Sequence, residues 1–403
     1  MPSKPVFGFY GGWATYRNGR GRCTVDDINP RLCTHLLYAF VALDHSGSIS
    51  SKSSGCRVVS SHLTQFHDTV SFTSLWHIPR TEPVFGFYGG WATYRNGRGR
   101  CTVDDINPRL CTHLLYAFVA LDHSGSIVQK DYTAQSAMRR FNNLRDQNRS
   151  LKTLVSIGGA VGCGSAFSTI AASSNLRASF ARNARSFCES YGFNGVDIDW
   201  EFLEGGADRA NFVQLLSVLA SELHGHGMLL TTSVGVNREY DVAGIARHVD
   251  YILLMSYDYN GSWDSHTGHN APLSWGSRLD KGAPRSKLIV DLAAYGRTFT
   301  LSSTGSNGVR ANASGAGPAG PYTQQSGTLA YYEVKDAFGG GYTWDDDQHV
   351  PYAWVSYDDP RSIRMKCDFI RREQLGGAMI WSIDQDEFQG DKFTLLRTVA
   401  ESL

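Results

Sequence analysis

Short runs of aliphatic, β-branched and aromatic residues alternate with longer amphipathic segments along the chain from Pro83 onward. Runs of this length and composition are typical of buried β-strands. The pattern predicts eight strands in series: Val84 to Tyr88, Leu114 to Val119, Thr153 to Ile157, Gly195 to Trp200, Leu229 to Val234, Tyr251 to Ser256, Leu288 to Ala293 and Ala378 to Ser382.

The segments between these runs have the spacing of amphipathic helices. Leu176 to Tyr191 and Asp208 to Leu223 are the clearest, and the second of them places four apolar side chains on one face, Phe212, Leu215, Leu216 and Leu219. Eight βα units in series predict an α/β fold closed as a TIM (β/α)8 barrel. A doubly wound parallel sheet is the competing architecture.

Two intervals depart from regular βα spacing. Residues 301–359, between the seventh and eighth strands, are too long for an ordinary loop and contain strand-like pieces at Leu329 to Val334 and Tyr352 to Ser356. We therefore expect a small α+β insertion there. Gly276 to Arg285, between the sixth and seventh strands, is too short and too rich in Gly and Pro for a crossover helix, so one barrel helix is expected to be missing.

The N-terminal region contains an exact repeat. Pro5 to Ile49 and Pro83 to Ile127 are identical at all 45 positions, and the stretch between them, Ser50 to Glu82, shows no strand or helix period. Repeat folds contain three or more diverged units, so a recent duplication or an assembly error explains the pair better. We expect residues 83–403 to form the barrel, with its first two strands from the second copy, and residues 1–82 not to be native architecture.

The composition excludes several classes of partner. Lys plus Arg equals Asp plus Glu at 38 each, so no overall field attracts nucleic acid or an anionic membrane. The apolar runs are shorter than the roughly 18 residues of a membrane helix. Aromatic residues make up 12% of the chain, which suits either a large core or a surface that stacks on sugar rings.

One predicted strand carries three acidic residues on one face. Because strand side chains alternate, Asp197, Asp199 and Glu201 point together, while Val196 and Ile198 point the other way. Carboxyl groups crowded on a buried face cannot all ionise, so one of them retains a proton and can serve as a general acid.

A metal site or a solvated strand end is the alternative interpretation of this acidic strand. A hard cation needs oxygen ligands from several loops, and the other acidic cluster, Asp345 to Asp347, lies in the insertion. The flanking apolar residues argue against a solvated strand. No metal and no cofactor is expected.

These acids belong to a segment that resembles the D-x-x-D-x-D-x-E signature of family 18 glycoside hydrolases. Three further family motifs follow the expected order: Ser156-Ile157-Gly158-Gly159, Met255-Ser256-Tyr257-Asp258 and Gly377-Ala378-Met379-Ile380-Trp381. The resemblance extends from about Val84 to Leu403. It implies an endochitinase-type hydrolase that acts on chitin or chitooligosaccharides, outside the cell and as a monomer.

In that family the substrate's own acetamido group is the nucleophile. The resemblance implies that Glu201 is the catalytic acid, that Asp199 orients the acetamido N–H, that Asp197 shares a proton with Asp199, and that Tyr257 donates to the acetamido oxygen. Trp381 would form the apolar floor of the cleft. Other family cleft positions, each of which could instead pack or pair locally, match Asp258, Met255, Met379, Tyr295, Arg297, Phe118 and Glu333.

The chain departs from the family pattern at several positions. Asn194 replaces the first signature acid, Ala160 replaces a tryptophan that stacks on a distant sugar, and Gly86 replaces the usual cysteine partner of Cys111. Lys335 also stands where vertebrate-type members of the family often have a cysteine. The remaining cysteines allow two conceivable pairs, Cys101 with Cys111 and Cys163 with Cys188, although spacing does not fix connectivity.

Signals for export are mixed. Glycosylation sequons start at Asn148, Asn260 and Asn312, whereas Met1 to Pro5 lacks the pattern of a signal peptide. The sequence is compatible with two rival interpretations. One is a catalytically silent chitinase-like lectin or growth-factor-like protein, which would typically lose the acids that this chain keeps. The other is a non-functional product of a faulty gene model.

Overall fold

The computed structural model describes two compact units, Met1–Ile78 and Pro79–Leu403. In the second unit it describes residues 82–129, 132–160, 162–235, 240–273, 282–303, 305–338, 343–345, 350–352 and 355–403. In the first unit it describes four short strands, β1 (Phe7–Gly11), β2 (His35–Ala39), β3 (Ala42–Leu43) and β4 (Ile49–Ser50).

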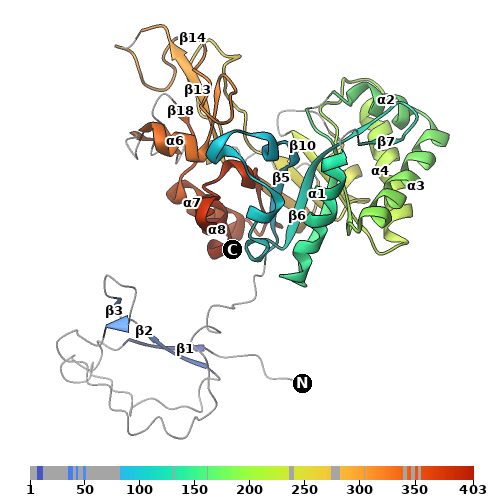
Figure 1. Cartoon of the computed structure of the whole chain (residues 1–403), viewed down its shortest axis with the longest axis horizontal. Coiled ribbons are helices and arrows are strands. Elements are labelled where there is room, and N and C mark those ends of the chain that lie inside the picture. Colours follow the sequence, from blue (N-terminus) through green and yellow to red (C-terminus); the bar gives the residue numbers. More distant parts are fainter. Residues whose placement is uncertain are drawn as a thin grey trace, which may run out of the picture. The chain divides into compact units, whose positions relative to one another are not determined.

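The second unit contains a closed parallel barrel (Figure 1). The first barrel strand pairs with the last, Val84 opposite Ala378, and also with the second, Phe85 opposite His113. This closure confirms the predicted TIM barrel over the doubly wound sheet. The strands are β5 (Val84–Gly89), β6 (His113–Leu121), β8 (Lys152–Gly158), β9 (Gly195–Asp199), β10 (Leu229–Gly235), β11 (Tyr251–Met255), β12 (Leu288–Ala293) and β19 (Gly377–Trp381).

Both copies of the repeat form the same strand pair. In the first unit β1 lies parallel to β2 with Phe7 opposite His35, which is the register of Phe85 opposite His113 in the barrel. The barrel strands β5 and β6 come from the second copy. Identical sequences therefore reach the same local pairing in both units.

Helices cover the outside of the barrel. The predicted apolar face of α4 is buried, and α3 begins at the N-cap Ser173 and ends at Gly192, whose φ of 84° suits a residue without a side chain. The helices are α1 (Tyr132–Asn143), α2 (Gly164–Ala172), α3 (Ser174–Tyr191), α4 (Asp208–His224), α5 (Val242–Ala246), α7 (Pro360–Arg372) and α8 (Thr394–Ser402). None of the helices within the described ranges is long and apolar enough to span a membrane.

The interval between β11 and β12 is only partly described. Residues 282–287 contain one turn of 3-10 helix, Arg285–Lys287. The rest of the predicted short crossover, residues 276–281, lies outside the described residues, so the missing barrel helix stays a prediction.

The predicted insertion lies between β12 and β19 and forms its own antiparallel sheet (Figure 1). It begins at Tyr295 and not at residue 301, because β13 follows β12 almost directly. Its elements are β13 (Tyr295–Leu301), β14 (Ala313–Ala316), β15 (Thr328–Ala330), α6 (Tyr331–Phe338), β16 (Thr343–Asp345), β17 (Val350–Tyr352) and β18 (Val355–Ser356).

One predicted strand in the insertion is wrong in part. Leu329 to Val334 turns from strand into helix α6 at Tyr331, although its Tyr and Val residues favour strands. The Glu333 carboxylate accepts a hydrogen bond of 2.9 Å from the backbone N–H of Ala330, which satisfies a donor at the helix start. This cap and the tertiary contacts of the segment override the strand propensity of its Tyr and Val residues.

The two conceivable disulfides do not form. All five cysteines of the second unit are buried thiols. The Cys163 sulfur accepts a hydrogen bond from the backbone N–H of Leu121, whereas the Cys188 thiol donates to the carbonyl of Gly195. The sulfurs of Cys163 and Cys188 thus pack against different strands of the barrel, which keeps this pair apart.

Candidate active site

Alternation along the strands separates the inside of the barrel from the outside. An apolar cluster fills the inside, made of Phe85, Phe87, Leu115, Ala117, Leu154, Leu253, Ile289 and Met379. On β9 the apolar residues Val196 and Ile198 join the outer core instead, and Trp200 stacks on Phe167 with ring centroids 5.4 Å apart. Asp197 and Asp199 are therefore left facing inward, as the alternation predicts.

Asp197 is fully buried and accepts three hydrogen bonds from hydroxyl groups of neighbouring strands. Ser156 on β8 donates at 2.7 Å, and Thr231 and Ser233 on β10 donate at 2.7 and 3.4 Å. Burial raises the pKa of Asp197 to about 6, and the three hydroxyl donors oppose that rise. Asp197 is thus the inward carboxyl best prepared to carry a negative charge.

Asp199 and Glu201 lie progressively nearer to solvent. Burial, followed by the charges of Glu201, Asp197 and Asp291, raises the pKa of Asp199 well above its usual value. Burial, followed by the charge of Asp258, raises the pKa of Glu201 to about 7. Glu201 is therefore protonated in part of its population near neutral pH and can act as an acid or as a base.

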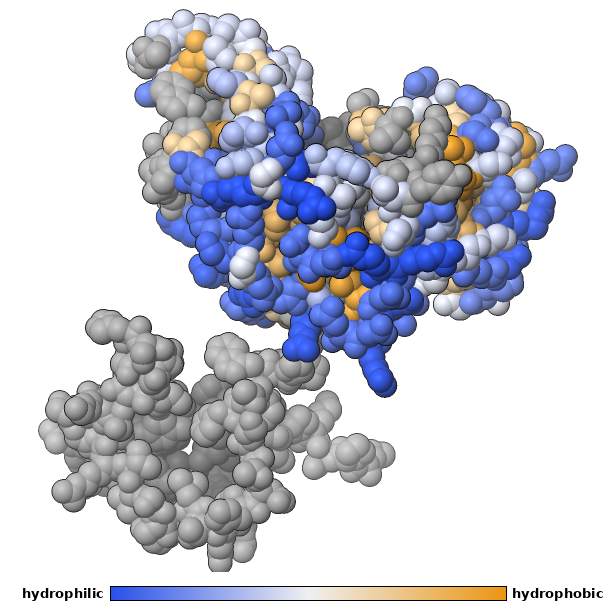
Figure 2. Space-filling model, viewed as in Figure 1, coloured by the Kyte–Doolittle hydropathy of each residue, from blue (hydrophilic) through white to orange (hydrophobic). Residues whose placement is uncertain are grey.

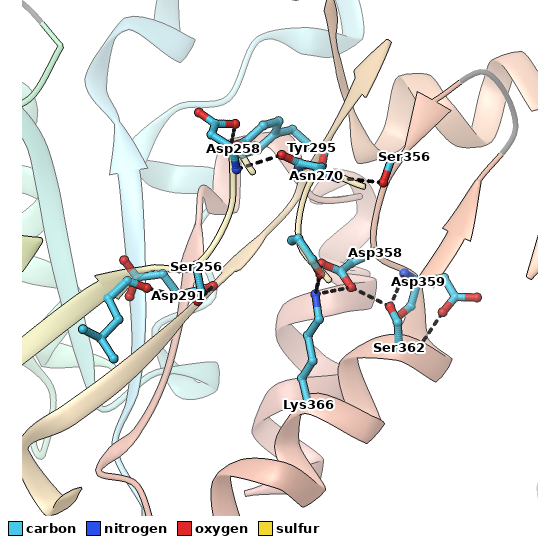
Figure 3. Close-up of polar contacts among 12 residues, drawn as sticks. Ser256, Asp258, Asn270, Asp291, Tyr295, Ser356, Asp358, Asp359, Ser362 and Lys366 are labelled. Atoms are coloured by element: carbon cyan, nitrogen blue, oxygen red, sulfur yellow. Dashed lines mark hydrogen bonds and ion pairs between the residues drawn. The ribbon is translucent and has the colours of Figure 1, made fainter. Parts of the chain in front are cut away.

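A second polar group lies after β11. Asp258 accepts hydrogen bonds from the Tyr295 hydroxyl at 2.6 Å and from two guanidinium nitrogens of Arg297 at 2.7 and 2.6 Å. The backbone N–H of Asp258 donates to the side-chain oxygen of Asn270. The backbone N–H of Asn270 in turn donates to the hydroxyl of Ser356, as Figure 3 shows. This network ties the end of β11 to the insertion and fixes the side chain of Asp258.

Tyr257 precedes Asp258 and faces the same cleft. Burial, followed by the charge of Asp291, raises the pKa of Tyr257 well above its usual value, so its hydroxyl keeps its proton and can donate a hydrogen bond.

Aromatic side chains form the apolar part of the site. Trp381, at the end of β19, stacks on Phe118 with ring centroids 5.6 Å apart and contacts Phe87 at 5.1 Å. Trp91 and Trp263 are 41% and 57% exposed, which is unusual for tryptophan in a folded protein. Exposed indole faces beside a carboxyl-lined floor suit the apolar faces of sugar rings.

These groups line one open cleft of about 900 Å³. Figure 2 shows the surface hollowed between the lobe that carries the insertion and the lobe that carries α2 to α4. Eight of the predicted site residues line the cleft: Asp199, Glu201, Tyr257, Asp258, Met255, Tyr295, Arg297 and Trp381. The structure thus brings these eight residues together from four different parts of the sequence.

Four predicted site residues lie elsewhere. Asp197 and Met379 are buried inside the barrel, and Phe118 supports Trp381. Glu333 is also buried, where its carboxylate accepts hydrogen bonds from the backbone N–H groups of Tyr322 and Thr323. Glu333 therefore holds a loop of the insertion whose residues line the cleft.

Local sequence explains two features of the motifs. A Cβ atom at Gly158 would lie 2.1 Å from the carbonyl oxygen of Asp199, and one at Gly159 would lie 2.3 Å from the Phe118 ring. Only glycine allows this approach of β8 to the acidic strand. Asn194 accepts hydrogen bonds from Thr153 and Arg145 outside the cleft, so the loss of this signature acid leaves the inward trio intact.

Sequence reasoning missed several residues of the site. Trp91, Trp263, Arg95 and Gln385 line the cleft, and Asp291 is buried inside the barrel. Strand alternation could have indicated Asp291, because it lies two residues after an inward apolar position. Across the described ranges, no group of three or more His, Cys, Asp or Glu side chains is arranged to hold a metal ion.

Comparison with known proteins gives a consistent result. Residues 83–386 match the model of glycosyl hydrolases family 18. Chitotriosidase-1 of Mus musculus is 36% identical over 365 residues, which are 78% of this chain and 76% of the mouse protein. The chain is thus similar to a chitotriosidase over more than three quarters of its length.

Solved structures agree. Group IV chitinase of Ostrinia furnacalis in complex with allosamidin superposes with a TM-score of 0.76 at 36% identity, covering 79% of this chain and 97% of the insect chain. Human YKL-39, described as a pseudo-chitinase with retained chitooligosaccharide binding properties, gives a TM-score of 0.75 at 33% identity, covering 80% and 99%. The family model matches most of this chain, and the chain is similar to chitinases and to a chitinase-like protein. These findings show that the chain belongs to glycosyl hydrolases family 18.

Proposed function

We propose that this protein is a chitinase that hydrolyses β-1,4 linkages between N-acetylglucosamine units with retention of anomeric configuration. The observation that carries the proposal is the inward row of Asp197, Asp199 and Glu201. Asp197, at the buried end of the row, accepts hydrogen bonds from three hydroxyl groups. Glu201, at the other end, lies in the cleft and has a pKa of about 7.

In the first step Glu201 gives its proton to the glycosidic oxygen. The bond between that oxygen and the anomeric carbon breaks, and its electron pair stays on the leaving sugar. The carbonyl oxygen of the substrate's acetamido group attacks the anomeric carbon and forms a cyclic oxazolinium ion. The chain therefore needs no protein nucleophile.

Asp199 and Tyr257 would position the acetamido group. Asp199 would accept a hydrogen bond from the acetamido N–H and balance the positive charge that develops on the sugar ring. The Tyr257 hydroxyl would donate a hydrogen bond to the acetamido oxygen. Asp199 must be ionised to do this, and it can pass its proton toward Asp197, whose three hydroxyl donors can reorient.

In the second step the Glu201 carboxylate takes a proton from water. The water oxygen attacks the anomeric carbon from the face that the leaving sugar vacated, and the bond to the acetamido oxygen breaks. Two displacements on opposite faces give retention. Trp381 would support the distorted sugar from below, and Arg297 would hold Asp258 near the bond that breaks.

The test compares the protein with Glu201→Gln. The variant deletes the transferable proton and keeps the shape of the side chain, so we expect loss of hydrolysis with retained binding of chitooligosaccharides. Glu204→Gln is the matched control, since Glu204 is exposed on the same loop. Proton NMR of the first product should show the β-anomer. Turnover by Glu201→Gln close to that of the unmodified protein would refute the assignment.

A chitooligosaccharide-binding lectin is the second candidate, favoured by the similarity to human YKL-39. It predicts binding without turnover in the unmodified protein, which the same assay detects.

We further propose that the protein acts outside the cell as a monomer. Of the three sequons, Asn312 is exposed, whereas the side-chain amides of Asn148 and Asn260 donate hydrogen bonds to backbone carbonyls. Secretion should therefore place a glycan first at Asn312, which mass spectrometry of the secreted protein would show.

A further inference from the structure

Asp384 carries a buried carboxyl group that the mechanism above does not use. It lies in a short 3-10 helix, η13 (Ile383–Gln385), which begins two residues after Trp381, and its side chain is fully buried. It lies outside the set of described residues that line the cleft. A buried carboxylate needs partners that replace its lost water, so the contacts of Asp384 indicate what it does.

Both ends of one loop are bound to Asp384. The loop runs from the end of β5 through the 3-10 helix η6 (Gly90–Tyr94) to Arg95. At its start, the backbone N–H of Gly89 donates a hydrogen bond of 3.0 Å to Oδ1 of Asp384. At its end, Nη1 of Arg95 lies 2.8 Å from Oδ2 of Asp384 and donates a hydrogen bond of 3.0 Å to its backbone carbonyl. Asp384 therefore clamps the loop that follows the first barrel strand.

This loop carries Trp91, whose indole lies against one of the clamped residues. A Cβ atom at Gly89 would lie 2.6 Å from the Trp91 ring, so the indole rests directly on the backbone that Asp384 holds. The rings of Phe118 and Trp381 lie beside it, with centroids 5.9 and 6.3 Å away. Trp91 is still 41% exposed, and it lines the cleft. Direct contacts thus connect Asp384 to the exposed face of this indole.

Trp91 extends the aromatic surface of the cleft beyond Trp381. When one sugar unit lies on Trp381, another unit of the same chain can stack on Trp91. An indole that is already fixed loses little conformational entropy when it binds, whereas the ordering of a mobile loop subtracts from the affinity. A clamp on this loop should therefore matter for long chains and not for short ones.

We propose that Asp384 is a positioning residue that determines substrate length, because it holds residues 89–95 so that Trp91 can stack on a distant unit of a chitooligosaccharide. The inference rests on the proposed function for the identity of the ligand. Asp384 itself does not touch the sugar and acts through Gly89 and Arg95. Its loss should weaken the binding of long chains and leave the binding of short chains unchanged.

Titration calorimetry in a Glu201→Gln background measures binding of the dimer and the hexamer of N-acetylglucosamine without turnover. Asp384→Asn removes the charge that pairs with Arg95. The Kd of the hexamer should rise about fivefold in this variant, and the Kd of the dimer should stay the same. In a Trp91→Ala background, Asp384→Asn should have no further effect on the hexamer, because the indole that Asp384 positions is absent.

Asp386→Asn is the matched control. Asp386 is equally buried in the same segment, but it accepts hydrogen bonds from the backbone N–H groups of Leu395 and Leu396 on α8. Its substitution should leave the ratio of the two Kd values unchanged. Gly89→Ala keeps Asp384 and places a methyl group where the indole lies, so it should reproduce the loss for the hexamer even if Asp384→Asn folds poorly.

Equal losses of affinity for dimer and hexamer in Asp384→Asn would overturn the proposal, because the effect would then not pass through a distant sugar. So would a fivefold loss that persists in the Trp91→Ala background, an equal change of the ratio in Asp386→Asn, or a failure of the Glu201→Gln protein to bind the hexamer. If the unmodified protein has no hydrolytic activity, the proposed function fails, and the affinities still decide the role of Asp384.

Discussion

The Ser156 hydroxyl on β8 donates a hydrogen bond of 2.7 Å to Oδ2 of Asp197 on the neighbouring strand β9. Two motifs that are far apart in the sequence thus meet inside the barrel, and one stabilises the charge of the other.

Ser156→Ala should raise the pKa of Asp197 above about 6, because a donor to the charged form is lost. A hydrogen bond of about 1 kcal/mol corresponds to somewhat less than one pH unit. The acid limb of kcat/KM should move to higher pH by that amount. Ser168→Ala removes a similar contact, 2.7 Å to Asp208 on α4 outside the barrel, and should leave the limb in place.

Glu201→Gln should stabilise the protein at alkaline pH. The folded-state pKa of Glu201, about 7, lies above the usual value of 4.5, so the folded state tolerates the charged form less well than the unfolded chain does. Its contribution to stability is fully present below pH 4.5 and is lost as the pH rises through 7. The variant should therefore melt a few degrees higher than the unmodified protein at pH 8.

Differential scanning calorimetry at pH 8 and at pH 4.5 checks this. The difference between the two proteins should shrink at pH 4.5, where Glu201 is protonated in the folded state and about half protonated in the unfolded chain. A lower melting temperature for the variant at pH 8 would contradict the stated cost of the buried charge.

Ala160→Trp should tighten binding of long oligomers more than that of dimers. Ala160 is exposed, lines the cleft and lies two residues after the end of β8, at the mouth of the barrel. An indole there could stack on a sugar remote from the cleaved bond and contribute about 1 kcal/mol, or roughly fivefold in affinity. Titration calorimetry with dimer and hexamer in a Glu201→Gln background measures both. Equal gains for the two ligands would show that position 160 does not reach a distal sugar.

Gly86→Cys should form a disulfide with Cys111. A Cβ atom built at Gly86 lies 3.1 Å from the sulfur of Cys111, which is close to the separation of these atoms in a disulfide. Closing the loop from residue 86 to residue 111 should stabilise the fold by about 3 kcal/mol, reduced by crowding against Ile383, whose Cγ2 lies 3.0 Å from the same Cβ.

Melting with and without reductant tests this bond. The melting temperature of Gly86→Cys should rise only under oxidising conditions. Gly86→Ala carries the Cβ without the sulfur and should melt slightly lower than the unmodified protein in both conditions. A reductant-insensitive melting temperature for Gly86→Cys would mean that no disulfide forms.

The sequence by itself was sufficient for the barrel and for the acidic row. Strand alternation is local, so Asp197, Asp199 and Glu201 could be placed on one face from their spacing, and eight apolar runs predicted eight strands. Tyr257 and Trp381 were indicated by the resemblance of their segments to family 18 motifs, and both line the cleft.

Other features depended on contacts between distant segments. Leu329 to Val334 has the composition of a strand, but Glu333 caps a helix there and holds a cleft loop through backbone groups that no local pattern indicates. The predicted pair of Cys163 and Cys188 failed for the same reason, because spacing in sequence does not report which strand a sulfur packs against.

The protonation of the site was also decided by tertiary structure. Residue types indicated that crowded carboxyls share protons, but only barrel closure decided which of them receives hydroxyl donors. Asp197 on β9 receives three such donors, whereas Asp291 on β12, three strands further along the sheet, receives none among the described residues. A carboxyl's pKa depends on its burial and on neighbours that come from other strands, and these become fixed only when the sheet closes.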